Sequence, residues 1–176
     1  MRTQLIAQDA ADEAVTVLYR GHALRLTQLA YVLLGDRGLA EDIVQEAFAR
    51  LRRRPRRLAD GSKAVFYLRT SVLNGCRMVL RRSAAVRALT LVDIWAGPLS
   101  VVAAAETAAL SGEERHALVS AIRRLPPRQR DALVLRFCLN EPETEIARLM
   151  RIRPGAVRST TYRALAALGR LLEEEP

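Results

Sequence analysis

Residues 39–48 read Leu-Ala-Glu-Asp-Ile-Val-Gln-Glu-Ala-Phe, a stretch in which apolar and polar residues alternate at the spacing of an α-helix. At about 100° per residue, one face of this helix collects the apolar side chains: Ile43, Val44, Ala47, Phe48 and Leu51. The opposite face carries Asp42, Gln45 and Glu46. This acidic face is either a solvated helix surface or a docking surface for a basic partner. The other segments of the chain are needed to distinguish the two.

The chain is strongly basic, which makes an acidic patch unusual in it. Its 176 residues include 28 Lys and Arg against 19 Asp and Glu, a formal net charge of +9, and Lys63 is the only lysine. A positive charge of this size favours a polyanionic partner, with nucleic acid ahead of an anionic membrane. The codon bias of a GC-rich genome would also raise the arginine content, so composition alone leaves both explanations open.

Several classes of protein are disfavoured by what the chain lacks. Cys76 and Cys138 lie in apolar helical patterns without a CxxC partner or a neighbouring histidine, so we expect reduced thiols and no zinc site. Residues 1–10 do not resemble a signal peptide, and no apolar run reaches the roughly 18 residues of a membrane-spanning helix. No constellation typical of catalysis or cofactor binding is present. We therefore expect a cytoplasmic binding protein rather than an enzyme, with no metal and no cofactor.

Helical periodicity runs through most of the sequence and predicts an all-α protein. We expect two small helical domains joined by a flexible linker: residues 9–82, a linker at 83–112, and residues 113–172. The helices of the first domain are expected at about 9–34, 38–54 and 62–82, the last with Ser62 as its N-cap. Those of the second are expected at about 113–124, 127–138, 143–150 and 154–172. The linker is rich in Ala and Val, and a short helix is expected within it at about 101–110.

The helix expected at 62–82 has a polar face that combines an aromatic ring, an amide, hydroxyl groups and guanidinium groups. Its members are Tyr67, Thr70, Ser71, Asn74, Arg77, Met78 and Arg81. A basic segment, Arg-Arg-Arg-Pro-Arg-Arg at 52–57, precedes it. Groups of these kinds stack on bases, bind base edges and neutralise phosphates, so the face predicts contact with nucleic acid. An acidic protein partner for the arginines is the alternative.

Residues 143–172 have the spacing of a helix-turn-helix. On the second helix, which begins at Pro154, one face is apolar and is expected to pack inward: Val157, Thr161, Ala164, Leu165, Leu168 and Leu172. The residues expected to project outward are Arg158, Ser159, Tyr162 and Arg163, with Arg153 at the turn. The second helix of such a motif places its N-terminal residues against base edges in the major groove. An ordinary corner between two helices would share this spacing.

The order of these parts resembles the bacterial RNA polymerase sigma factors of the extracytoplasmic function (ECF, group IV) type. The resemblance covers about 14–82 and 113–172. Residues 34–48 are similar to the family's region 2.1–2.2, and residues 67–82 are similar to its region 2.3–2.4. Leu-Pro-Pro-Arg-Gln-Arg at 125–130, Glu-Ile-Ala at 145–147 and the segment from Pro154 to Leu165 are similar to region 4. Each match is modest, but their order and spacing together are specific.

The resemblance implies a promoter-specificity subunit that binds core RNA polymerase and starts transcription. Asp42, Gln45 and Glu46 would bind the clamp helices of the β′ subunit, and the β flap would contact the C-terminal domain. The −10 promoter element, with its bases flipped out of the melted duplex, would be held by Arg56, Arg57, Tyr67, Thr70, Asn74, Arg77 and Arg81. The −35 element would be read as duplex by Arg153, Arg158, Ser159, Tyr162 and Arg163. An anti-sigma factor, usual in the family, would be a further partner.

One segment departs from the family's pattern, and one residue is unusual in a helix. Met-Arg-Ile-Arg at 150–153 stands where Leu-Gly-x-Ser is usual, so a helix cap is lost and charge is gained. Gly75 interrupts the expected third helix at a cost of about 1 kcal/mol relative to alanine. The alternatives to a sigma factor are a stand-alone helix-turn-helix regulator, a helical enzyme acting on nucleic acid, and an RNA-binding protein. Adding core polymerase separates them, because only a sigma factor gains promoter binding from it.

Overall fold

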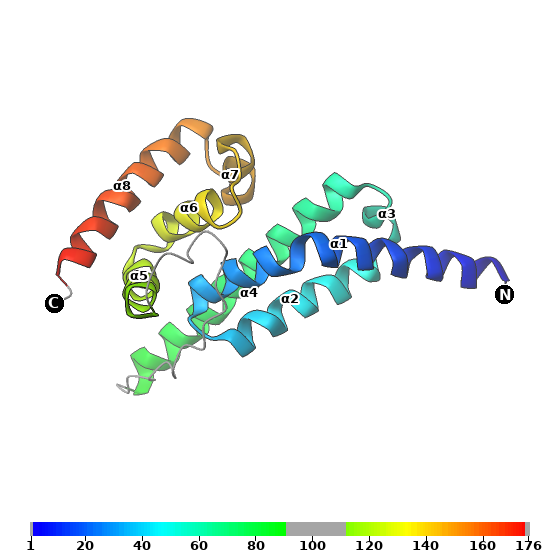
Figure 1. Ribbon diagram of the computed structural model, residues 1–176, viewed down its shortest axis with the longest axis horizontal. Coiled ribbons are helices and arrows are strands. Elements are labelled where there is room, and N and C mark those ends of the chain that lie inside the picture. The colour runs from blue at the N-terminus through cyan, green and yellow to red at the C-terminus, as the bar shows by residue number, and fades with distance from the viewer. Residues whose placement is uncertain (1, 91–111, 175–176) are drawn as a thin grey trace.

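The computed structural model describes residues 2–90 and 112–174, and over these residues the chain forms eight helices and no strand (Figure 1). The expected all-α class is confirmed. The helices are α1 (Arg2–Leu34), α2 (Arg37–Arg52), α3 (Pro55–Leu58), α4 (Gly61–Thr90), α5 (Gly112–Arg124), α6 (Pro127–Phe137), α7 (Glu143–Met150) and α8 (Pro154–Glu173).

Some local details differ from the expectations. Residues 83–90, expected in the linker, continue α4, because this stretch is rich in good helix formers such as Ala and Arg. The basic segment contains one helical turn, α3, because the fixed φ of Pro55 suits the first position of a helix. The carboxylate of Asp60, and not Ser62, accepts the backbone N–H of Lys63 at 3.1 Å. The short helix expected at 101–110 lies outside the described residues.

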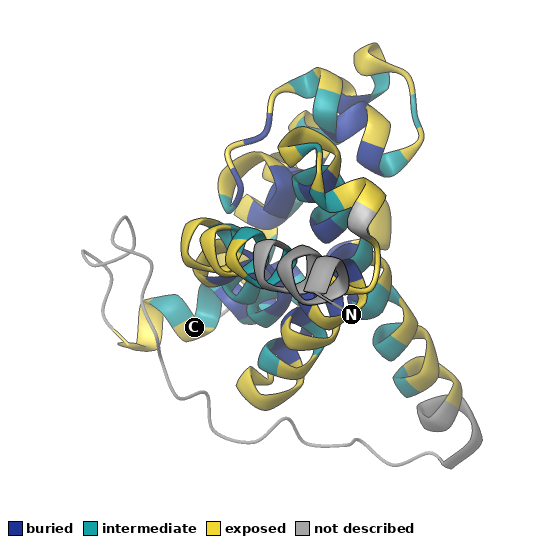
Figure 2. Cartoon of the chain, turned by 90° about the vertical axis from the view of Figure 1, so that its right-hand side faces the viewer, coloured by how far each residue is buried: buried dark blue, intermediate teal, exposed yellow. Residues whose placement is uncertain are grey.

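The first three long helices, α1, α2 and α4, pack against one another, with α3 at one end (Figure 1). The apolar face predicted for α2 is confirmed, since Val44, Ala47, Phe48 and Leu51 are all buried. α2 begins where the Asp36 carboxylate accepts the backbone N–H of Leu39 at 2.9 Å, which satisfies one of the free donors of the first turn. Buried residues gather on the helix faces that are turned toward each other, and exposed residues cover the outer faces (Figure 2).

Gly75 lies where α4 crosses α2. A methyl group at this position would lie 2.9 Å from Cγ2 of Ile43, closer than real side chains approach one another. The glycine therefore lets the two helix backbones come together, and the loss of helix propensity is offset by this close packing. The polar face of α4 is thereby held at a fixed angle to α2.

The helix-turn-helix expected from the sequence is formed by α7 and α8. Ile146, Ala147 and Leu149 of α7 are buried, as are Val157, Ala164 and Leu168 of α8. The expected inward positions of Leu165 and Leu172 are wrong, because these side chains are 46% and 37% exposed. Leu165 follows the buried Ala164 and is therefore rotated by about 100° away from the apolar stripe.

The turn between α7 and α8 holds an arginine in the left-handed conformation. Arg151 has φ 55° and ψ 48°, and its backbone N–H bonds to carbonyl groups at the end of α7. A residue with a Cβ atom is strained there by about 1 kcal/mol, which is why glycine is common at this position of a helix end. Arg153, the N-cap of α8, makes no capping hydrogen bond through its side chain. Both positions thus carry positive charge at the expense of local stability.

None of the helices in the described part of the chain combines the length and the apolar character that crossing a membrane requires.

Replacing Gly75 with alanine tests the close approach of α2 and α4. We expect Gly75→Ala to lower the free energy of unfolding by about 1–3 kcal/mol through overpacking against Ile43. Urea denaturation measures the change. Gly169→Ala is the matched control, because no atom lies within 4 Å of the added methyl group on α8. The control should gain up to about 1 kcal/mol from helix propensity, and an equal gain at both positions would contradict the close approach.

The strain at Arg151 is tested by comparing two substitutions. Arg151→Gly should raise the free energy of unfolding by about 1 kcal/mol relative to Arg151→Ala, because only glycine relieves the left-handed backbone. Both variants remove the same charged side chain, so their difference isolates the backbone conformation. Thermal and urea denaturation of the two proteins provide the measurement. Equal stabilities would show that the turn is unstrained.

Candidate polymerase- and nucleic-acid-binding surfaces

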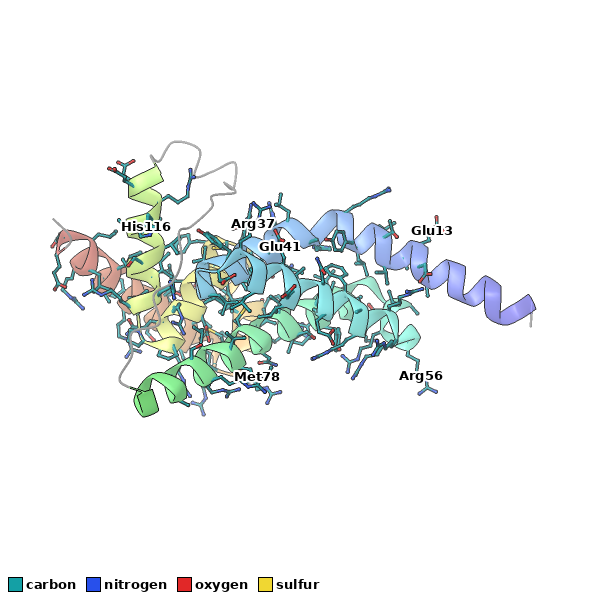
Figure 3. All side chains as sticks on the ribbon, turned by 90° about the horizontal axis from the view of Figure 1, so that it is seen from below. Glu13, Arg37, Glu41, Arg56, Met78 and His116 are labelled. Carbon is teal, nitrogen blue, oxygen red and sulfur yellow. The ribbon has the colours of Figure 1, made fainter. Side chains whose placement is uncertain are left out.

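The acidic face of α2 is exposed as expected. Asp42, Gln45 and Glu46 all lie on the outer side of the helix. Glu46 is partly neutralised by Arg50, whose Nε lies 2.6 Å from its Oε1. One turn earlier, Arg37 pairs with Glu41 at 2.7 Å, and the two side chains lie next to each other (Figure 3). Among the described residues Asp42 forms no ion pair, so its carboxylate is available to a partner.

A groove of about 330 Å³ runs between α1 and α2 beside this acidic face. It is lined by Tyr19, Leu24 and Tyr31 from α1 and by Glu41 and Gln45 from α2. Leu24 is 61% exposed although it is a large apolar residue. An apolar wall next to carboxylates suits a helix that has both apolar and basic residues. Sequence patterns on separate helices gave no sign of this groove.

The basic segment and α4 meet at Tyr67. The guanidinium carbons of Arg54 and Arg57 lie 5.3 and 5.0 Å from the centroid of its ring, within the range of cation–π contact. Arg56 points away from the body of the molecule (Figure 3). An aromatic ring among arginines is the arrangement that stacks a base and binds its phosphate at the same time.

Tyr67, Asn74 and Arg81 are spaced seven residues apart and form one stripe along α4. Asn74 and Arg81 are exposed, and Tyr67 is half-buried. Two further residues predicted for this surface are engaged elsewhere. The Thr70 hydroxyl donates to the carbonyl of Phe66 at 2.8 Å, and Arg77 donates through Nε to the Asp131 carboxylate at 2.8 Å.

The residues predicted to read duplex DNA share the outer face of α8. Arg153, Arg158, Ser159, Tyr162 and Arg163 are all exposed, and Tyr162 is 75% exposed. Glu143 of α7, which sequence reasoning missed, accepts from Arg158 at 3.3 and 3.4 Å. This contact between the two helices of the motif holds the guanidinium near the start of α8. No periodic pattern indicates it, because the pair joins two separate elements.

The described residues hold no group of three or more histidine, cysteine or acidic side chains placed to bind a metal ion. Cys76 and Cys138 are free thiols. Burial raises the pKa of Cys76 to about 12 and that of Cys138 to about 11, so both thiols stay protonated near neutral pH and are poor nucleophiles.

Comparison with known proteins places the chain in a family. Residues 18–86 match the family described as Sigma-70 region 2, and residues 115–168 match Sigma-70, region 4. The probable ECF RNA polymerase sigma factor SigI of Mycobacterium tuberculosis is 33% identical over 157 residues. That alignment covers 86% of this chain and 53% of SigI, so the chain spans about half the length of this relative.

Two further proteins match over almost the whole chain. The solved complex of the sigma factor RpoE with the anti-sigma factor NepR from Bartonella quintana has a TM-score of 0.65 and 20% identity, covering 99% of this chain and 97% of the other, which shows a shared fold. The RNA polymerase sigma factor CarQ of Myxococcus xanthus is 30% identical over 167 residues, covering 95% of this chain and 94% of CarQ. With both regions present in order, the chain belongs to the sigma-70 family of RNA polymerase sigma factors, in its ECF group.

Proposed function

We propose that this chain is a promoter-specificity subunit that binds core RNA polymerase, recognises the −10 and −35 elements of a promoter and starts transcription. The observation that carries the proposal is the acidic face of α2 on a chain with a net charge of +9. An acidic face repels phosphates, so it favours a basic protein partner over nucleic acid. The role of this chain would be to bind the polymerase and the promoter, while the polymerase carries out RNA synthesis.

The polymerase would dock on α1 and α2. Asp42, Gln45 and Glu46 offer acceptors to a basic partner, and the groove beside them exposes Leu24 and Tyr31 to an apolar one. The β′ clamp helices fit this combination, since a helix in a groove is held by apolar contacts and fixed in register by polar ones. The β flap would contact the C-terminal helices. An anti-sigma protein is proposed as a further partner.

The −10 element would be captured by α3 and the stripe on α4. The ring of Tyr67 can stack on a base that has left the duplex, while Arg56 and Arg57 neutralise the adjacent phosphates. Asn74 and Arg81 continue the same stripe and are exposed, so they would contact base edges and the DNA backbone. Unstacking costs a few kcal/mol per base, so this surface works only when the polymerase helps to open the DNA.

The −35 element would be read as duplex by α8. Its exposed face presents Arg158, Ser159, Tyr162 and Arg163 to the major groove, with Arg153 near a phosphate. The guanidinium of Arg158 is already held near the start of the helix by Glu143. A positioned arginine loses less freedom on binding and can bond a guanine with two parallel hydrogen bonds.

Run-off transcription tests the proposal. Core polymerase is supplied with genomic DNA fragments, with and without this chain. We expect the chain to direct initiation at a discrete set of sites that share two motifs at promoter spacing. If no transcript depends on the chain but the free chain binds specific DNA, the stand-alone regulator replaces the sigma factor.

A charge reversal on α2 tests whether the chain docks on core polymerase through the acidic face. Asp42→Arg should abolish binding to core polymerase, because the reversed charge repels the basic partner. Glu13→Arg is the matched control, since Glu13 is exposed on α1 toward its N-terminal end (Figure 3). Fluorescence anisotropy with labelled chain measures both affinities. Retained binding by Asp42→Arg would exclude this face as the docking surface.

Reading of the −35 element is tested at Arg158. Arg158→Ala should reduce discrimination between the preferred −35 sequence and a substituted one by about 1–3 kcal/mol. Competition binding of holoenzyme to promoter fragments measures it. Arg170→Ala, which removes an exposed arginine near the end of α8, should leave the discrimination unchanged. An unaltered base preference in Arg158→Ala would remove this residue from the reading surface.

A further inference from the structure

The first residue of α7, Glu143, forms an ion pair with Arg158 on the outer face of α8. Nε of Arg158 lies 3.3 Å from Oε1 of Glu143, and Nη2 lies 3.4 Å from Oε2. Such a two-point contact fixes the guanidinium group relative to the carboxylate. The side chain of Arg158 is 81% exposed, whereas that of Glu143 is 36% exposed. The pair therefore leaves most of the arginine open to a partner.

This pairing uses one edge of the guanidinium group and leaves another edge free. Nε and Nη2 face the carboxylate, and Nη1 donates to no group in the part of the chain that the structure describes. The free edge consists of Nη1 and the second N–H of Nη2. It can donate two hydrogen bonds to O6 and N7 of a guanine. Glu143 thus fixes the plane in which that guanine has to lie, and with it the base pair that Arg158 can reach.

The other outward side chains of α8 are not tied to a second helix. The Ser159 hydroxyl donates to the carbonyl of Ala156 at 3.2 Å, and Nε of Arg163 donates to the carbonyl of Ser159 at 3.2 Å. Both hydrogen bonds stay within α8. Among the described residues assigned above to the −35 element, Arg158 is therefore the one whose direction is set from outside its own helix.

An acidic side chain beside DNA has a cost that depends on its partner. In water, an exposed ion pair of this kind stabilises a protein little. Beside phosphates, a carboxylate that has lost its cation is repelled, and the exclusion of water strengthens the repulsion. Arg158 can therefore leave Glu143 for a phosphate, or for the edge of a wrong base, only by leaving that carboxylate unpaired next to the DNA. A guanine in the plane of the pair is bound without this penalty.

We infer that Glu143 is a positioning residue that makes Arg158 selective for guanine and weakens the attraction of Arg158 to phosphates. This role depends on the proposed reading of the −35 element by α8, and it names the base that Arg158 selects. The carboxylate has opposite effects on two kinds of DNA. At the preferred sequence it orients the guanidinium group, and elsewhere it cancels the charge that would bind any phosphate. Glu143 thus lowers general affinity for DNA and raises discrimination.

Base preference is measured by selection from DNA of randomised sequence. Holoenzyme containing each full-length variant selects binding sites from a pool of such duplexes. Arg158→Ala first identifies the guanine that Arg158 reads, as the position where the preference is lost. At that position, and at no other, Glu143→Gln should lower the preference for guanine at least about threefold. Glu145→Gln is the matched control, because Glu145 lies in the same turn of α7 and pairs with Arg148 instead, at 2.6 Å.

Binding to non-specific DNA provides the second measurement. On a duplex that lacks the selected sequence, Glu143→Gln should bind more tightly than the wild-type chain, because the charge of Arg158 is no longer neutralised. The slope of log K against log salt concentration should become more negative by about 0.9, the value for one further phosphate contact. A folding defect would weaken binding to every duplex, so it would not combine tighter non-specific binding with a lost preference at one base.

A double variant shows whether Glu143 acts through Arg158. In the Arg158→Ala background, Glu143→Gln should cause no further change in base preference. An unchanged guanine preference in Glu143→Gln, or a loss spread over other positions, would overturn the selective role. An unchanged salt slope would overturn the effect on phosphates. If the chain forms no holoenzyme, the sigma-factor proposal fails, and the free full-length chain with the same DNA pool then decides the role of Glu143.

Discussion

The packing of α4 is the constraint on which the other features of this protein depend. Its apolar side is buried against α1 and α2, and Gly75 lets α2 approach until Ile43 fills the space a side chain would need. Once that angle is fixed, the stripe of Tyr67 and Asn74 faces outward and Arg77 faces region 4. One helix therefore supplies part of the core, a candidate DNA surface and the boundary between the two regions.

In the helix-turn-helix, by contrast, positive charge is gained at the expense of local stability. Its turn holds Arg151 in a left-handed conformation, and Arg153 occupies a cap position without making the capping bond. A glycine and a serine there would fold more easily, as the chemistry of helix ends dictates. Backbone strain tends to persist where a site benefits from it, and two positive charges beside the start of α8 would benefit a surface that meets phosphates.

The sequence was informative where a feature repeats along one helix. The buried face of α2 and the outer face of α8 follow from the 3.6-residue period, and the structure confirms both. The sequence offered no indication of features that are formed by residues from two different helices. The pair between Arg77 and Asp131 joins residues 54 positions apart, and the groove beside Gln45 depends on how α1 lies against α2. The role of Gly75 was equally hidden, because its neighbour Ile43 belongs to another helix.

The acidic residues of this basic chain lie both on its surface and inside the fold. With a net charge of +9, the chain attracts nucleic acid, and arginine contacts with phosphates bind without regard to sequence. Asp131 and Glu141 occupy two of these arginines from inside the fold. Asp42, by contrast, stays exposed on the far side of α2, where a basic partner can reach it. Acidic residues thus occupy two kinds of position in this chain: Asp42 is exposed on α2, and Asp131 and Glu141 are buried against arginines of α4.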